Sequence, residues 1–110
     1  MTYSPTDASK LIDDLAKLCD EREEWLIQLE WPGKGGTETY PWPDMSLGLE
    51  FRDETLETFA IQPFERHLPA TYRKVTLTGE GFYPTITRAD LEIVLTDFLA
   101  EYGGDPSVTI

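Results

Sequence analysis

TRADLEIVLTDFLAEY, residues 87–102, carries the clearest helical pattern in the chain. Its apolar residues recur at helical spacing and form one continuous stripe. They are Leu91, Val94, Leu95, Phe98, Leu99 and Tyr102. Thr87 is placed to cap the first turn, with Asp90 three residues later, and Gly103 and Gly104 end the helix. Such a stripe has to be covered by a sheet or by another helix, so this segment decides the fold.

Ile93 departs from the stripe. A step of about 100° per residue places it on the opposite face of the helix, beside Thr96, Asp97 and Ala100. A single exposed isoleucine is common on protein surfaces. Here, however, the small side chain of Ala100 leaves low relief beside it, which would suit a partner side chain or a second copy of the chain. The sequence therefore offers Ile93 as a partner-binding residue and its face as the surface of a homodimer.

A second amphipathic helix is expected near the N-terminus, starting at Ser4 or Thr6 beside Pro5 and ending near Glu23. Its apolar face consists of Ala8, Leu11, Ile12, Leu15, Leu18 and Cys19. The opposite face is the densest acidic surface of the sequence and carries Asp13, Asp14, Asp20, Glu21 and Glu24, interrupted by Lys10 and Lys17. An ordinary solvated helix face is the plain interpretation, and a surface for a basic partner is the functional one.

Alternating apolar and polar residues predict four strands between the helices. The strands cover residues 25–31, 46–52, 56–62 and 72–78, and a long loop rich in glycine and proline covers residues 32–44. In the first strand Trp25 falls on the same face as Ile27, Leu29 and Trp31. Pro63 is expected to end the third strand.

These elements predict an α+β fold with a single two-layer domain over residues 1–110. The order is α-β-β-β-β-α, with a four-stranded antiparallel sheet and two helices packed on one face. One-sided alternation in the strands favours this arrangement, because it leaves the second face of the sheet polar and partly wet.

The charge of the chain limits its partners. Lys and Arg number 9 against 21 Asp and Glu, which gives a net charge of −12. This charge disfavours direct binding to nucleic acid or to an anionic membrane. Because 40% of the residues are apolar and 12% are aromatic, a packed core is expected rather than disorder. The acidity then serves either general solubility, including in a high-salt habitat, or the recognition of a basic protein.

Cys19 is the single cysteine, so no internal disulfide can form, and its position on the apolar helix face predicts a buried, reduced thiol. The N-terminal residues lack the pattern of a signal peptide, and no apolar run approaches the roughly 20 residues of a membrane span. The sequence thus favours a cytoplasmic location.

Catalytic patterns are missing from the sequence. His67 is the only histidine and lies in a proline-bounded loop, which favours a structural or merely exposed side chain over a catalytic one. Neither a Cys/His cluster nor a calcium-type ligand loop is present, so we expect no metal and no cofactor. We therefore expect a protein that is not an enzyme.

Tyr40 and Trp42 lie in the long loop, beside Glu38 and Asp44. Exposed aromatic residues next to carboxylates resemble the composition of binding hot spots. In the alternative, Trp42 folds back over the end of the core as a lid.

Together these features predict a small acidic protein that binds and inhibits a basic, nucleic-acid-handling protein by charge mimicry. Immunity proteins of nuclease toxins and phage inhibitors of nucleic-acid-guided defence complexes, of the anti-CRISPR kind, belong to this class. The expected partner-binding residues are Asp13, Asp20, Glu21, Glu24, Tyr40, Trp42 and Ile93. The alternative is an accessory subunit of a larger assembly, whose acidity serves solubility alone.

Overall fold

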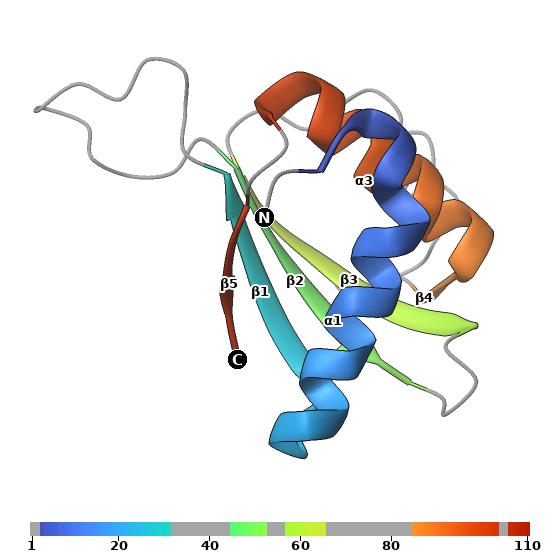
Figure 1. Ribbon diagram of the computed structural model, residues 1–110, viewed down its shortest axis with the longest axis vertical. Coiled ribbons are helices and arrows are strands. Elements are labelled where there is room, and N and C mark those ends of the chain that lie inside the picture. Colours follow the sequence, from blue (N-terminus) through green and yellow to red (C-terminus); the bar gives the residue numbers. More distant parts are fainter. Residues whose placement is uncertain (1–2, 32–44, 53–56, 66–84, 104–105) are drawn as a thin grey trace, which may run out of the picture.

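Two helices lie across one face of an antiparallel sheet in the computed structural model of the chain (Figure 1). The structure describes residues 3–31, 45–52, 57–65, 85–103 and 106–110. In chain order the elements are η1 (Pro5–Asp7), α1 (Ala8–Arg22), β1 (Leu26–Trp31), β2 (Met45–Phe51), β3 (Thr58–Glu65), β4 (Thr85–Thr87), α3 (Arg88–Tyr102) and β5 (Ser107–Thr109). The predicted α+β class with two helices and an antiparallel sheet is therefore confirmed.

The sheet has five strands in the part of the chain that is described, in the order β4-β3-β2-β1-β5, so the prediction of four strands is wrong. Every neighbouring pair is antiparallel. Strands β4 and β5 have three residues each, which is too short for an alternating pattern to stand out in the sequence. The strand expected over residues 72–78 lies outside the described residues.

Both predicted helices are present, although α1 begins at Ala8, after a 3₁₀ turn, and not at Ser4 or Thr6. The hydroxyl of Thr87 accepts a hydrogen bond from the Asp90 backbone N–H at 3.3 Å, which caps the first turn of α3. Gly103 ends that helix with φ 99°, a backbone conformation that side chains disfavour. At the N-terminus a 3₁₀ turn after Ser4 leads into α1, and hydrogen bonds from Ser4 lower the pKa of Asp7.

The core lies between the helices and the sheet. The α1 stripe and the α3 stripe join the inward side chains of the strands in one buried cluster, from which only Leu18 and Tyr102 of the predicted stripes stay partly exposed. Trp31, Phe59 and Phe98 are the largest side chains that are fully buried. The rings of Trp31 and Phe98 lie 5.0 Å apart, so β1 and α3 meet at the centre of this core.

Trp25 does not continue the inward face of β1 as predicted. The strand begins one residue later, at Leu26, and Trp25 remains 38% exposed. Its ring lies at the margin of the core, 6.1 Å from the ring of Phe51. Trp25 does alternate with Ile27 in the sequence. It precedes the strand, however, and the helix layer does not cover it.

Pro63 does not end β3, which runs on to Glu65. Arg52 donates its N–H to the carbonyl of Thr58, and hydrogen-bonded and non-bonded pairs alternate along an antiparallel ladder. The pair of Leu47 and Pro63 therefore falls on a non-bonded position, where the proline nitrogen faces away from β2. Because β4 pairs only with residues 58–60, no described strand requires a donor there.

The thiol of Cys19 is buried in the core, as predicted. Burial and the nearby charge of Glu24 raise its pKa to about 11, from an ordinary value of 9.0. At pH 8 the thiolate fraction should be roughly 100-fold below that of an unperturbed cysteine. We expect a thiol reagent to modify the folded protein at least that much more slowly than the urea-unfolded protein. Equal rates in both states, measured with a chromogenic disulfide reagent, would contradict the burial of Cys19.

Candidate partner-binding surface

The four predicted carboxylates of α1 fall into two separate groups. Asp13 lies in the middle of the helix and faces α3, where it pairs with Arg88. Asp20, Glu21 and Glu24 lie two turns later, exposed at the C-terminal end of the helix. The two groups therefore have different structural surroundings.

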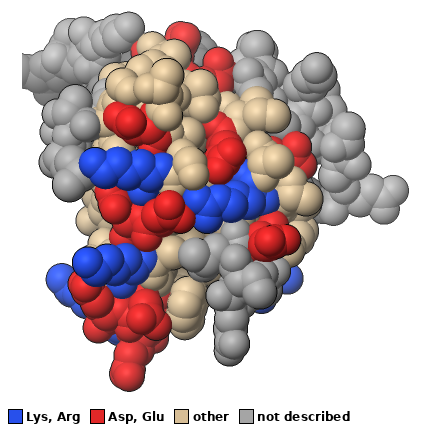
Figure 2. Space-filling view, turned by 45° about the vertical axis from the view of Figure 1, so that its right-hand side comes forward, with Lys and Arg blue, Asp and Glu red and all other residues tan. Residues whose placement is uncertain are grey.

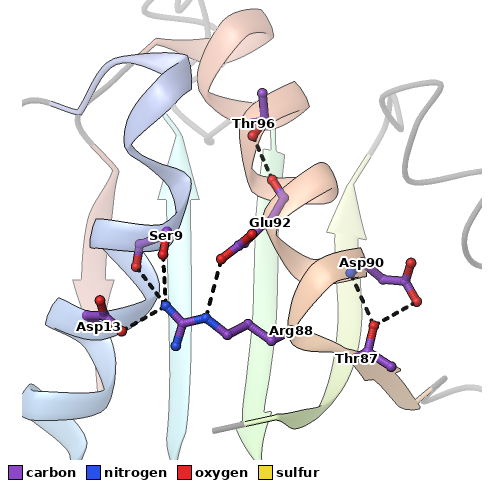
Figure 3. Close-up of polar contacts among 7 residues, drawn as sticks. All are labelled: Ser9, Asp13, Thr87, Arg88, Asp90, Glu92 and Thr96. Atoms are coloured by element: carbon purple, nitrogen blue, oxygen red, sulfur yellow. Dashed lines mark hydrogen bonds and ion pairs between the residues drawn. The ribbon is translucent and has the colours of Figure 1, made fainter.

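Arg88 at the start of α3 joins the two helices through one guanidinium group (Figure 3). Its Nη2 donates to Asp13 Oδ1 at 2.8 Å, and to the hydroxyl and carbonyl of Ser9 at 2.9 and 3.2 Å. Its Nε donates to Glu92 Oε1 at 3.3 Å. The hydrogen bond to Asp13 and, less strongly, the one to Glu92 raise the pKa of Arg88. Asp13 thus serves as a clamp between helices, and its charge is locally compensated.

Removing this clamp should have a modest and measurable effect. Asp13→Asn and Arg88→Gln should each lower the free energy of unfolding, and a double-mutant cycle should give a coupling of about 0.2–1 kcal/mol, as for exposed ion pairs. Asp20→Asn is the matched control, since it removes an acidic charge from the same helix and, in the part of the chain that the structure describes, Asp20 makes no ion pair with α3. A cycle in urea denaturation with no coupling would show that the pair contributes nothing to stability.

Negative charge is concentrated at the C-terminal end of α1, where it destabilises the helix. We call Asp20, Glu21, Glu23 and Glu24 the acidic end of α1; Arg22 is the one basic residue among them. The C-terminus of a helix carries the negative end of its dipole, which carboxylates oppose. Figure 2 shows acidic side chains gathered at the lower end of the molecule, where α1 ends. The charge therefore lies where the helix itself least favours it.

The backbone at this position is also unusual. Glu23 adopts the left-handed conformation, with φ 56° and ψ 32°, and is the only residue other than glycine with positive φ in the described part of the chain. This conformation costs a side-chain-bearing residue roughly 1 kcal/mol relative to glycine. The turn is closed by Glu23 N–H to the Asp20 carbonyl at 3.3 Å and by Glu24 N–H to the Cys19 carbonyl at 3.0 Å. A glycine would stabilise the turn, but it would remove one carboxylate.

Exposed apolar side chains follow the acidic end directly. Trp25 is partly exposed, and Leu26 is 61% exposed at the start of β1. Leu26 lies opposite Glu50 of β2 and points away from the helices, because Ile27 beside it is buried in the core. Charged and apolar surface are therefore adjacent at this end of the molecule.

Ile93 lies on the outer face of α3 and is 50% exposed. A shallow hollow surrounds it, lined by Ala89, Glu92, Thr96, Asp97 and Ala100. The position agrees with helical geometry, but a homodimer through this face stays a prediction.

Tyr40, Trp42 and His67 lie outside the described residues. Within the described ranges, no cluster of His, Cys, Asp or Glu has an arrangement that could hold a metal ion. None of the helices that the structure describes is long and apolar enough to cross a membrane.

Sequence reasoning missed three features of this surface. Leu26 could have been found, since strand alternation already puts it on the face away from the helices. The conformation of Glu23 could be suspected only from its place just after the helix. Arg88 gave no signal, because its partner Asp13 is 75 residues away in the sequence.

Comparisons of the chain with protein-family models, with curated proteins and with solved structures found no match.

Proposed function

We propose that this protein is a non-enzymatic inhibitor that binds a basic, nucleic-acid-handling protein by charge mimicry. The observation that supports this most is the acidic end of α1, where exposed carboxylates oppose the helix dipole and one of them occupies a left-handed position. Local rules that favour stability are most often broken where function requires it. Exposed carboxylates can take the place of phosphate groups in a positively charged groove.

The charge of the whole chain supports the same proposal. A net charge of −12 attracts a basic partner over a distance of about a Debye length and accelerates their encounter. The acidic end would then make the close contacts. Because α1 is anchored by buried Leu15, Ala16 and Cys19, the backbone that carries Asp20 and Glu21 is already ordered before binding.

We also propose that the protein works in the cytoplasm, where the Cys19 thiol stays reduced. The accessory-subunit alternative predicts a different kind of contact with the partner. An apolar subunit contact would tolerate salt, whereas a charge mimic loses its partner as salt rises.

Affinity capture from the lysate of the native host tests the proposal. The immobilised protein is compared with a neutralised variant that carries Asp20→Asn, Glu21→Gln and Glu24→Gln. We expect the parent to retain a basic protein at low salt, to release it at high salt, and to block its binding to nucleic acid. If the neutralised variant retains the same protein equally well, or if the captured protein still binds nucleic acid normally, the proposal is wrong.

A further inference from the structure

A hollow of about 270 Å³ lies on the face of the sheet that the helices do not cover. We call it the outer hollow. Its lining includes Leu26, Gln28, Gly48, Glu50, Ala60 and Ile110. These residues come from β1, β2, β3 and the end of the chain after β5, so the hollow spans the middle of the sheet rather than one edge.

Gly48 forms the floor of the outer hollow. The register places it opposite Gln28 of β1, which in turn lies opposite Thr109 of β5. A glycine in the middle of a strand weakens it, and is usually explained by a bulge, by an unusual backbone conformation or by the close approach of another molecule. The pairing of β2 continues without interruption on both sides, and its φ is not positive. Neither a bulge nor a positive φ therefore accounts for this glycine, which leaves the surface of the sheet without a side chain at this point.

The rim of the outer hollow is apolar and exposed. Leu26 and Ile110 are 61% and 41% exposed, although both belong to the larger apolar side chains of the chain. A large exposed apolar side chain beside a concave site is typical of a surface that another molecule covers. One buried apolar side chain from a partner would fill the space above Gly48.

The charges around the outer hollow are mainly negative. Glu50 is the one ionisable group in its described lining, and Arg52 pairs with it at 3.3 Å. Glu24 of the acidic end is two residues before Leu26, so at most about 7 Å of backbone separates them. Glu30 lies on the same face of β1 as Gln28, whose amide donates to it at 3.2 Å. A second copy of this acidic chain would bring like charges together here, which disfavours it as the occupant.

We propose that the outer hollow seats an apolar side chain of the basic partner, flanked by Lys or Arg residues that face Glu24 and Glu50. This inference rests on the proposed function, because it takes the partner to be basic. It adds a second element to recognition: the acidic end would attract the partner, and the outer hollow would select a segment with an apolar anchor between basic residues.

Three synthetic peptides test this inference by titration of the full chain, with amide shifts followed by NMR. One peptide carries Leu-Phe between Lys and Arg residues, the second replaces Leu-Phe by Ser-Ser, and the third keeps Leu-Phe between Ser and Gly residues. We expect the first to bind at least about tenfold more tightly than the other two, as expected for one buried apolar side chain. The amide shifts that the first peptide causes should be largest at Leu26, Gly48 and Ala60.

Gly48→Val places a β-branched side chain, which suits an extended strand, in the lining of the outer hollow. It should keep the fold and weaken the first peptide at least about tenfold, again by the value of one apolar side chain. Thr58→Val, on the same face but outside the lining, is the matched control and should bind as the parent does. A folded Gly48→Val that binds equally well would overturn the inference.

The same titration separates this inference from the proposed function. If the neutralised variant loses the first peptide but Gly48→Val does not, the charge mimicry stands and the role of the outer hollow is wrong. If neither variant changes binding, the inference is wrong, and the affinity capture with the neutralised variant decides the proposed function separately. Equal affinity for the first and third peptides would show that the hollow binds an apolar segment without basic neighbours. If the parent self-associates and Gly48→Val does not, the hollow binds a second copy of the chain. Either result contradicts the inference.

Discussion

Replacing Trp31 by alanine should lower the free energy of unfolding by about 3–5 kcal/mol, the range for large aromatic residues removed from a core. Trp31 is fully buried in β1 and contacts Phe98 of α3. Its Nε1 also donates to the carbonyl of Gly103 at 3.2 Å, which fixes the end of α3 to the sheet. The substitution removes both the packing and this bond. Small domains are stable by only about 5–15 kcal/mol, so the variant should be close to unfolding at room temperature.

Trp25→Ala is the matched control, because it removes the same side chain six residues earlier. Trp25 is partly exposed and lies at the margin of the core, so we expect a clearly smaller loss, about 1 kcal/mol. Urea denaturation followed by circular dichroism measures both variants without relying on tryptophan fluorescence. Equal losses in the two variants would mean that the meeting of β1 and α3 is not the centre of the core.

Neutralising the acidic end of α1 should slow association with the basic partner about tenfold or more. The neutralised variant with Asp20→Asn, Glu21→Gln and Glu24→Gln removes three charges that oppose the helix dipole. Its stability should therefore be unchanged or slightly higher than that of the parent. The partner isolated by affinity capture and stopped-flow kinetics provide the measurement.

The control for this variant removes the same number of charges elsewhere. Glu57→Gln, Asp97→Asn and Glu101→Gln change the net charge equally but leave the acidic end intact. We expect this control to slow association much less. If both variants slow it equally, only the overall charge matters, and the acidic end is not the contact surface.

Periodicity allowed most of the fold to be predicted. The stripes of α1 and α3 and the alternation in β1, β2 and β3 each extend over several residues, and every one of these elements was found. The short strands β4 and β5 could not be predicted, because three residues show too little of a pattern. Proline signals in the sequence also misled, since whether Pro63 interrupts β3 depends on the hydrogen-bond register with β2.

The candidate surface was predictable only in part. Helical spacing identified the exposed side chains of Asp20, Glu21 and Glu24, because the opposite face of α1 is apolar. The pairing of Asp13 with Arg88 depends on how two distant helices pack, which no local pattern contains. The outer hollow depends on the register that brings Gly48 between its neighbours, and strand alternation does not define register.

The salt dependence of the association rate tests the central claim most directly. Between about 0.1 M and about 1 M salt the Debye length falls from about 10 Å to about 3 Å, so long-range attraction is largely screened. With the captured partner, the rate for the parent protein should fall at least about tenfold over this range, while the rate for the neutralised variant should start lower and change much less. A parent rate that varies no more with salt than that of the neutralised variant would contradict recognition by charge mimicry.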